Sequence, residues 1–361
     1  MVIFQLIQKP QKRGAEIFAA QLSEELSKLG HRVYLISLFE GSSDLPFLGE
    51  ILHLNRPLSK RWYDFSGWKM LAHLVKTYQP DLIQCNAGDT LKWAVISKIL
   101  FGWKSLIVAR NASTVSSYIN SGFTKKINSY LYAKADAIVS VSKHSKNDLN
   151  QLFLSTSHKT TVIPIGINNK QITNVEWKSK KSLINIIHVG GFTFEKNHVG
   201  LLAIWESFLK LQPNAVLHLF GDGPLRNEIE QKIIENGLQE SIFLYGWIDN
   251  PIDYIAKADV LVLPSIIEGL PAVILEAMYC KTSVVAYNVG GVSEIVSKET
   301  GYLIEKGNKL EFVKAINNSV SQDCSDRIKF AYDFVNRNFN NQIISLRFEN
   351  QYRKLKNSNA I

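Results

Sequence analysis

One stretch, residues 258–278, most constrains the fold, because it joins a strand pattern directly to a helix pattern. Its first six residues are apolar and predict a buried strand. Pro264 and Gly269 then indicate a turn, and Pro271 suits the first position of a helix, where its missing N–H costs nothing. A turn that leads from a strand into a helix gathers free N–H groups and the positive end of the helix dipole. The stretch therefore predicts a site for an anion such as a phosphate.

Two glutamates flank this turn, Glu268 before the predicted helix and Glu276 inside it. Two carboxylates beside a phosphate would repel it, so we expect them to face hydroxyl groups instead. A ligand that carries both phosphates and hydroxyl groups is a sugar nucleotide. The alternative is a structural pair, with Glu268 capping the helix and Glu276 facing solvent.

The same alternation of strand, turn and helix recurs along the 361 residues and predicts an α/β protein. We expect two doubly wound parallel-sheet domains that face each other across a cleft. Residues 1–166 form the first domain, residues 167–339 the second, and residues 340–361 a helical tail. The polar residues 166–182 are predicted to link the two domains. Residues 45–68 are predicted to have irregular structure. The predicted strands are 2–6, 33–38, 81–85, 105–109, 137–142 and 161–165 in the first domain, and 184–189, 215–220, 242–244, 258–263 and 283–286 in the second.

Composition excludes several classes of protein. No long apolar run predicts a transmembrane helix, and the first residues do not resemble a signal peptide, so we expect a cytoplasmic protein. The three cysteines follow no pattern and the eight histidines form no cluster with metal-ligand spacing, so we expect no metal site. The chain also lacks the signatures of nucleic-acid-binding modules.

The net charge of +9 lies in the first half of the chain. Residues 1–165 hold 20 Lys and Arg against 11 Asp and Glu, whereas the remainder holds 21 of each. This excess favours an anionic membrane surface or a pyrophosphate-linked ligand as partner, and a solvated basic face without a partner is the alternative. The predicted helix 118–133 carries basic and aromatic residues. It is either a membrane-surface helix, which would make the protein peripheral to the membrane, or an ordinary amphipathic helix.

Cations and glycines at the predicted strand ends mark further candidate residues. Lys196 follows strand 184–189 in a glycine-rich turn and is expected to clamp a phosphate. Arg110 and Asn111 come just past the predicted end of strand 105–109, where ligands bind in open α/β sheets. Glycines let the backbone approach a ligand closely, although each could equally serve a tight turn; they are Gly190, Gly191, Gly221 and Gly223.

These residues resemble a known family. The spacing Glu268-x7-Glu276 within Glu-Gly-Leu-Pro-x5-Glu-Ala is similar to the signature of retaining glycosyltransferases of family 4, which have the GT-B fold. The resemblance covers nearly the whole chain and is most specific in residues 184–305. It also implies that the helical tail 340–361 crosses back to the first domain. It includes Glu195-Lys196-Asn197, Gly221-Asp222-Gly223-Pro224, Gly290-Gly291 with Glu294, and Val162-Ile163-Pro164.

The resemblance implies a role for each matching position. Glu268 would contact the donor sugar and Lys196 would neutralise the departing diphosphate, as the catalytic pair. Glu276 would hold the ribose hydroxyls. The other donor-binding positions are Arg13, Gly14, Gly190, Gly191, Asn197, Gly221, Asp222, Gly223, Gly246, Trp247, Gly269, Leu270, Pro271 and Ala272. The acceptor-binding positions are Glu16, Arg110 and Asn111. Neither a metal nor another cofactor is implied, and the nucleoside-diphosphate sugar is the donor substrate.

Two departures from the family bear on the site. Many relatives carry an arginine where this chain has Gly191, so one diphosphate cation is missing, and Arg13 or Arg110 is a candidate replacement. Relatives often carry a histidine near the acceptor after the strand that here ends at Arg110, so Arg110 could contact an acceptor phosphate or the donor.

The resemblance implies a metal-independent hexosyltransferase. It would transfer a hexose with retention, from a UDP-sugar, to a glycan or polyprenyl-diphosphate-linked acceptor in capsule or O-antigen assembly. Two other interpretations stay open at this point. One is a sugar-nucleotide 2-epimerase, which shares the fold, and the other is a non-catalytic subunit that binds a sugar nucleotide.

Overall fold

The structure, a computed structural model, describes residues 1–168, 171–178 and 184–358. Its packing divides the chain into two compact units. The N-terminal unit comprises Met1–Asn168 and Asn340–Ile361, and the C-terminal unit comprises Asn169–Phe339. Each unit is built on a parallel sheet, as the sequence predicts.

The sheet of the N-terminal unit has seven strands among the described residues, in the order β3-β2-β1-β4-β5-β6-β7, and every neighbouring pair is parallel. Its inner strands are buried on both faces, which is why they appear in the sequence as nearly continuous apolar runs. The strands are β1 (Val2–Ile7), β2 (Arg32–Phe39), β3 (Ile51–Arg56), β4 (Leu82–Cys85), β5 (Leu106–Asn111), β6 (Ala137–Ser140) and β7 (Thr160–Val162).

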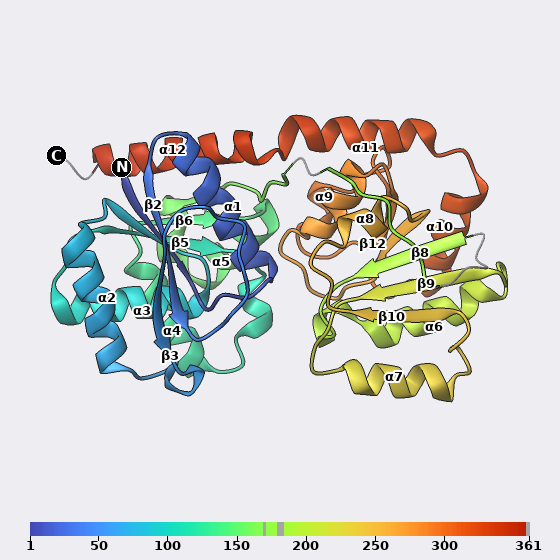
Figure 1. Cartoon of the computed structure of the whole chain (residues 1–361), viewed down its shortest axis with the longest axis horizontal. Helices are drawn as coiled ribbons and strands as arrows, with labels where there is room; N and C mark the ends of the chain where they lie inside the picture. The colour runs from blue at the N-terminus through green and yellow to red at the C-terminus, as the bar shows by residue number, and fades with distance from the viewer. Residues whose placement is uncertain (169–170, 179–183, 359–361) are drawn as a thin grey trace. The chain divides into compact units, whose positions relative to one another are not determined.

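Helices cover both faces of this sheet (Figure 1). They are α1 (Gly14–Lys28), α2 (Phe65–Tyr78), α3 (Gly88–Phe101), α4 (Gly122–Ala133), α5 (Lys143–Leu152) and α12 (Asn341–Ser358). Helices α2 and α3 pack together and contribute Trp68 and Trp93 to a hydrophobic core cluster of the unit. Helix α1 packs on β1 and β2, and α12 packs along α1.

The C-terminal helix α12 is an integral part of the N-terminal unit. Its Phe348 contacts Phe18 of α1, with ring centres 5.8 Å apart. Tyr352 is fully buried, and its hydroxyl donates a hydrogen bond to Oε1 of Gln84 in the central strand β4, at 2.5 Å. Because a buried hydroxyl needs such a partner, this bond fixes where the helix lies on the sheet.

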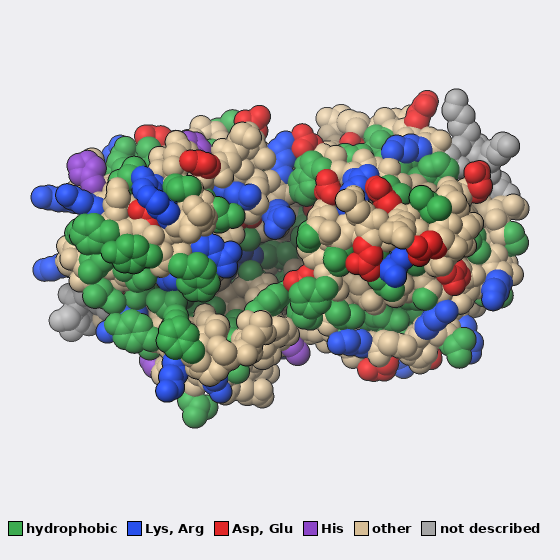
Figure 2. All heavy atoms as spheres, turned by 90° about the horizontal axis from the view of Figure 1, so that it is seen from below, with side chains coloured by type: hydrophobic (Ala, Val, Ile, Leu, Met, Phe, Trp, Pro, Cys, Tyr) green, Lys and Arg blue, Asp and Glu red, His purple; other side chains and the backbone are tan. Residues whose placement is uncertain are grey.

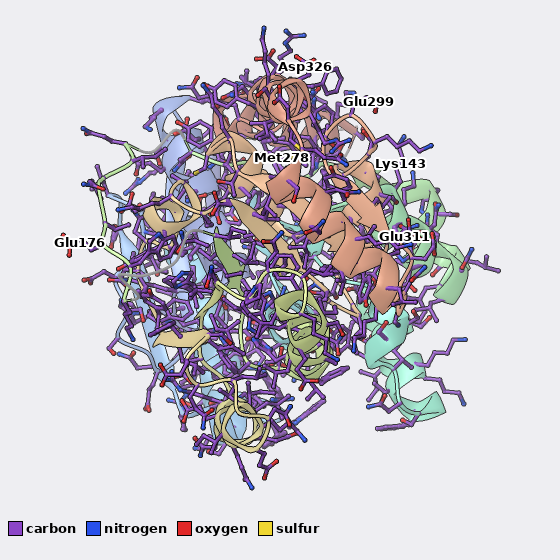
Figure 3. The ribbon with its side chains drawn as sticks, turned by 90° about the vertical axis from the view of Figure 1, so that its right-hand side faces the viewer. Lys143, Glu176, Met278, Glu299, Glu311 and Asp326 are labelled. Atoms are coloured by element: carbon purple, nitrogen blue, oxygen red, sulfur yellow. The ribbon has the colours of Figure 1, made fainter. Side chains whose placement is uncertain are left out.

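The C-terminal unit repeats the same design with six strands in its described part, in the order β10-β9-β8-β11-β12-β13. The strands are β8 (Ile184–Val189), β9 (Ala215–Phe220), β10 (Ile242–Gly246), β11 (Val260–Leu263), β12 (Ser283–Tyr287) and β13 (Tyr302–Ile304). The helices are α6 (His198–Leu209), α7 (Arg226–Glu235), α8 (Ile252–Ile255), α9 (Ala272–Tyr279), α10 (Lys309–Ser321) and α11 (Ser325–Asn338). Glu311 lies in the first turn of α10 and Asp326 in that of α11, where negative charge suits the helix dipole (Figure 3).

Several predicted boundaries need correction. Residues 45–68 are not wholly irregular, since they contain the edge strand β3. Strand β5 continues through Asn111, so Arg110 and Asn111 are its last two residues and do not follow it. Strand β7 ends at Val162, and the helix predicted from residue 118 begins at Gly122.

Part of the predicted linker 166–182 packs on the C-terminal unit. The ring of Trp177 stacks on His218 of β9, with centres 3.9 Å apart. The Thr173 hydroxyl donates to the carboxylate of Asp253 at 2.7 Å. Residues 169–170 and 179–182 of the predicted linker lie outside the described residues.

Charge is unequal on the surfaces of the two units. In the face that Figure 2 presents, Lys, Arg and large hydrophobic side chains gather on the N-terminal unit, and most of the visible Asp and Glu side chains lie on the C-terminal unit. The N-terminal unit exposes several aromatic side chains, which include Trp62, Tyr63, Phe65 and Phe123. Among the described helices, none combines the length and the apolar composition needed to cross a membrane.

Candidate active site

The predicted donor residues of the C-terminal unit lie where its strand order reverses. Strand β8 has β9 on one side and β11 on the other, so the loops after β8 and β11 leave the sheet in different directions. Such a switch point opens a crevice at the carboxyl ends of the strands, which is the usual ligand site of open α/β sheets. The loop after β8 carries Lys196, and the loop after β11 carries Glu268.

Glycines let the loops after β8, β9 and β10 lie directly against one another. Gly190 N–H donates to the Phe220 carbonyl at 2.9 Å, and Gly221 N–H donates to the Gly246 carbonyl at 2.8 Å. Gly221 has φ +131°, and a Cβ there would overlap the carbonyl oxygen of Gly190. A Cβ at Gly223 would stand 2.6 Å from the carbonyl oxygen of Phe192. Side chains at Gly221 and Gly223 would therefore force these loops apart.

Lys196 and Glu268 form an ion pair at the centre of this edge. The Lys196 ammonium is 2.6 Å from Oε1 of Glu268, and the two side chains are 23% and 9% exposed. The loops that carry them are joined by a hydrogen bond from Ile266 N–H to the Glu195 carbonyl at 2.8 Å. Because the cation and the carboxylate are held together, a ligand with phosphate and hydroxyl groups would meet both at one point.

Two other residues hold this pair in place. Asn197 adopts φ +55°, caps α6 through its Oδ1, and donates from its amide to the Pro264 carbonyl at 3.0 Å. Gly290 adopts φ +56°, and a Cβ there would overlap the carbonyl oxygen of Glu268. The chain therefore needs glycine at 290 to let the loop after β12 close on the Glu268 turn.

Helix α9 presents its N-terminus to the same edge. Pro271 is its N-cap residue and Ala272 its first residue, one position later than predicted. Gly269 accepts a hydrogen bond from Gly291 N–H at 2.9 Å, and the side chain of Leu270 is buried. The helix buries five of its eight residues, which include Met278, labelled in Figure 3. Ile274 N–H donates to the Pro271 carbonyl at 3.2 Å. The N–H groups of Ala272 and Val273 precede the first bonds of the helix, which suits them to an anion.

Glu276, Asp222 and Gly191 complete the predicted positions beside these loops. Glu276 is half-buried and lies on the fifth position of α9. The carboxylate of Asp222 accepts from Gly223 N–H at 2.7 Å and so shapes the loop after β9. A Cβ at Gly191 would have no neighbour closer than 3.5 Å, so a larger side chain would fit there.

Gly246 is the last residue of β10, two residues beyond the predicted end of the strand, and Trp247 follows it. Gly246 has φ +71°, and the indole of Trp247 is half exposed and donates to Asp249 at 3.3 Å. A terminal nitrogen of Arg226, the first residue of α7, lies 3.0 Å from where a Gly246 Cβ would stand. The sequence reasoning missed Arg226, because nothing in a lone arginine at a helix start indicates this neighbour.

The remaining predicted residues belong to the N-terminal unit. Arg13 is the N-cap residue of α1 and is exposed. Gly14 begins the helix, and a Cβ there would meet nothing within 4 Å. Glu16 is buried in the first turn, where Gln11 donates to its carboxylate at 3.0 Å, and burial raises the pKa of Glu16.

Arg110 is a buried cation with unpaired N–H groups. It is 6% exposed, and its guanidinium carbon lies 4.1 Å from the centre of the Phe18 ring. Its Nε and one terminal nitrogen have no hydrogen-bond partner among the described residues. Burial lowers the pKa of Arg110 to about 10, so the group stays charged at neutral pH. The Glu16 carboxylate raises the pKa of Arg110 through space, and the two nitrogens without hydrogen-bond partners in the described chain are suited to a bound anion.

Asn111, the neighbour of Arg110, is engaged within the unit. Its amide nitrogen donates to the hydroxyl of Ser140 at 3.3 Å and to the carbonyl of Ser145 at 3.0 Å. These bonds tie the end of β5 to β6 and α5.

Two models of known protein families match the chain. Residues 12–171 match the model described as Glycosyltransferase Family 4, and residues 169–334 match the model described as Glycosyl transferases group 1. The chain belongs to the GT-B glycosyltransferases. The first matched segment contains strands β2 to β7, and the second contains strands β8 to β13.

Two curated relatives of this glycosyltransferase have names that describe polysaccharide or glycan synthesis. One is the N-acetylgalactosamine-N,N'-diacetylbacillosaminyl-diphospho-undecaprenol 4-alpha-N-acetylgalactosaminyltransferase of Campylobacter jejuni, which is 28% identical over 62% of this chain. That match covers 63% of the Campylobacter protein, which is less than two thirds of its length. The other is the amylovoran biosynthesis glycosyltransferase AmsD of Erwinia amylovora, 23% identical over 86% of this chain and 87% of its own.

Several solved structures have the same fold as this glycosyltransferase. Sucrose-phosphate synthase from Thermosynechococcus elongatus superposes with a TM-score of 0.86 at 20% identity, covering 99% of each chain. Anabaena HepE in complex with UDP-glucose superposes with a TM-score of 0.82 at 19% identity, covering 98% of this chain and 100% of that one. At such identities the likeness concerns the fold alone.

The glycosyltransferase also buries polar groups behind the donor loops that the sequence did not single out. His188 Nε2, both ring nitrogens of His198, and the Ser265 hydroxyl have no hydrogen-bond partner among the described residues. Burial lowers the pKa of His188 to about 4 and that of His198 to about 2, so both rings are neutral at pH 7. Neutral rings leave Lys196 as the cation beside the Glu268 carboxylate.

Proposed function

We propose that this glycosyltransferase is a retaining, metal-independent hexosyltransferase. It takes a hexose from a nucleoside-diphosphate sugar, with a UDP-sugar as the expected donor, and transfers it to a lipid-linked or oligosaccharide acceptor. The observation that carries the proposal is the 2.6 Å ion pair between Lys196 and Glu268 at the switch point of the second sheet. A sugar nucleotide offers the phosphates and hydroxyl groups that this pair and the α9 N-terminus can bind.

The proposed donor-binding roles follow from position. Lys196 and the first-turn N–H groups of α9 would bind the diphosphate, while Glu268 would accept hydrogen bonds from hydroxyl groups of the hexose. Glu276, four positions into α9, would accept from the ribose hydroxyls. The half-exposed Trp247 beside Gly246 would line the pocket for the base.

Transfer needs the negative charge that develops on the leaving diphosphate to be stabilised. An ammonium group and a helix N-terminus can do this by fixed electrostatics, without a metal. In the proposed front-face mechanism, the acceptor hydroxyl attacks from the side on which the diphosphate leaves. The new glycosidic C–O bond forms as the C–O bond to the phosphate breaks, and the acceptor proton passes to a phosphate oxygen. The configuration at the anomeric carbon is therefore retained.

The proposed acceptor is attached to a polyprenyl diphosphate during assembly of a bacterial surface polysaccharide. The names of the Campylobacter and Erwinia relatives support this setting. The unpaired, buried guanidinium of Arg110 supports an anionic group in the acceptor. The basic and aromatic surface of the N-terminal unit supports a peripheral position on the cytoplasmic face of the membrane.

Calorimetric titration with UDP, GDP, ADP and their hexose conjugates tests the donor proposal. One nucleoside diphosphate is expected to bind to the wild type, and Glu276→Gln is expected to weaken it by about tenfold or more, since a charge-assisted hydrogen bond to ribose is lost. Glu235→Gln, at the end of α7, is the matched control and should bind like the wild type. If no nucleotide binds to the wild type, or if Glu276→Gln binds as tightly, the assigned site is wrong.

A further inference from the structure

The N-terminal unit contains a pocket that none of the predicted site residues lines. Its volume is about 340 Å³, and it lies between the loop that carries Trp62, the start of α3 and one side of α4. Gln8 follows β1 directly, and Asp89 lies in the first turn of α3, after β4. The pocket is therefore at the carboxyl edge of the sheet, the edge at which β5 ends with Arg110 and Asn111.

The floor of this pocket is polar but electrically neutral. The carboxylate of Asp89 accepts from the Gln8 amide at 2.9 Å and from the Lys92 ammonium at 2.8 Å. The side chains of Asp89 and Lys92 are only 14% and 8% exposed. Because the cation and the carboxylate cancel, the pocket offers no net charge to a phosphate, in contrast to Arg110.

The walls of the pocket are aromatic and apolar. Trp62 and Phe123 line it and are 62% and 74% exposed, and Ile127 adds an apolar surface from α4. The ammonium of Lys92 lies 4.0 Å from the centre of the Trp62 ring. This cation–π contact links the aromatic wall to the polar floor.

The combination discriminates between possible occupants. A hydrocarbon chain would cover the Asp89–Lys92 pair and offer it no hydrogen bonds, which is a costly burial. A diphosphate would meet the Asp89 carboxylate, while the Lys92 ammonium lies against the Trp62 ring and its side chain is 8% exposed, compared with 23% for Lys196 in the donor site. A pyranose ring has an apolar face of C–H groups for the aromatic walls and hydroxyl groups for the polar floor, and pockets of a few hundred Å³ suit small ligands of this kind.

We infer that this pocket is a subsite for a neutral sugar residue of the acceptor. The inference rests on the proposed transfer function and adds to it the part of the acceptor that the N-terminal unit recognises. Strands β1 and β5 are separated by β4 alone. Neighbouring strands are spaced by about 4.8 Å, so the ends of β1 and β5 are on the order of 10 Å apart. Ile107 and Ala109 of β5 pack in the cluster that holds Trp93 of α3, whereas Arg110 packs on Phe18 of α1, so the subsite rests on its own lining and does not depend on Arg110.

Saturation-transfer NMR on the full chain tests the inference. The probes are the methyl α- and β-glycosides of glucose, galactose, N-acetylglucosamine and N-acetylgalactosamine. At least one is expected to bind to the wild type, and Trp62→Ala and Phe123→Ala should each weaken binding by about tenfold, the effect of losing an aromatic anchor. Both side chains are largely exposed, so neither substitution should unfold the protein. Tyr130→Ala, which removes an exposed ring of α4 that does not line the pocket, should bind like the wild type.

Other results would overturn the inference. The inference is wrong if no glycoside binds to the wild type, or if Trp62→Ala binds the glycoside as tightly as the wild type does. Binding of citronellyl phosphate that depends on Trp62, without any glycoside binding, would assign the pocket to a prenyl chain instead. UDP and the nucleotide of highest affinity are titrated into the same samples. Intact nucleotide binding with a negative glycoside result refutes the subsite alone, whereas loss of both refutes the proposed transfer function.

Discussion

Lys196→Met is expected to lower the turnover of the sugar-nucleotide donor by about a hundredfold to a thousandfold, the effect of removing one group that stabilises charge in a transition state. Methionine keeps most of the aliphatic length of lysine and removes the ammonium that lies 2.6 Å from Glu268. Without this cation, the charge that develops on the leaving diphosphate is met by the α9 N-terminus alone. Release of the nucleoside diphosphate, followed by a coupled assay, measures the effect.

The control for this experiment is Lys232→Met on α7, whose ammonium lies 3.9 Å from a Glu228 carboxylate at the surface. It should turn over donor like the wild type. Lys196→Met also leaves the nearly buried Glu268 without its cation, so a lower melting temperature is expected and is measured alongside. The double variant with Glu268→Gln should regain stability without regaining activity. Turnover of Lys196→Met within about threefold of the wild type would refute the assigned role.

Arg110→Met is expected to separate acceptor binding from stability. The guanidinium leaves two nitrogen atoms unpaired in the interior, so its removal should keep or raise the melting temperature. The same removal should raise the KM for a citronellyl-diphosphate-linked N-acetylhexosamine by about tenfold to a hundredfold, because charge-assisted bonds to the diphosphate are lost. Steady-state kinetics with varied acceptor and thermal unfolding measure the two effects on one sample.

Arg32→Met is the matched control, since Arg32 is exposed on β2 and its guanidinium carbon lies 5.2 Å from the Tyr34 ring centre. It should leave the acceptor KM unchanged. A fall in the melting temperature of Arg110→Met together with an unchanged acceptor KM would make Arg110 a structural residue.

The fold class could be predicted because most strands are buried on both faces and therefore form continuous apolar runs. Strand β3 could not be found in this way. Leu54 is its one buried residue, and the strand pairs with β2 at the edge of the sheet with a shift in register. Its sequence therefore lacks the apolar run that marks the inner strands, and only pairing with β2 makes it a strand.

The donor loops could be predicted from the Glu268–Glu276 spacing and the glycines, because their local sequence specifies turn chemistry. The contacts between loops could not. Lys196 and Glu268 are 72 residues apart. The close approach of Gly290 to the Glu268 carbonyl, which leaves no room for a Cβ, is visible only in the folded structure. The unpaired state of Arg110 likewise depends on what surrounds it, and no property of an isolated arginine reports that.

The pocket lined by Trp62 and Asp89 could not be predicted from the sequence either. Its polar floor joins Gln8 to Asp89 and Lys92, and its aromatic wall comes from two further segments of the chain. Each of these residues is unremarkable in the sequence. Their assembly follows from the parallel order β1-β4, which places the ends of distant segments at one edge.

One measurement tests the central claim most directly. Proton NMR follows the slow hydrolysis of the donor sugar nucleotide by the wild type in excess EDTA, with water as the acceptor and Glu268→Gln as the inactive baseline. Because the attack is proposed to occur on the face that the diphosphate leaves, an α-linked donor should release the α-anomer first, and EDTA should not slow the reaction. First appearance of the β-anomer, dependence on a divalent cation, or absence of turnover with every donor would contradict the account.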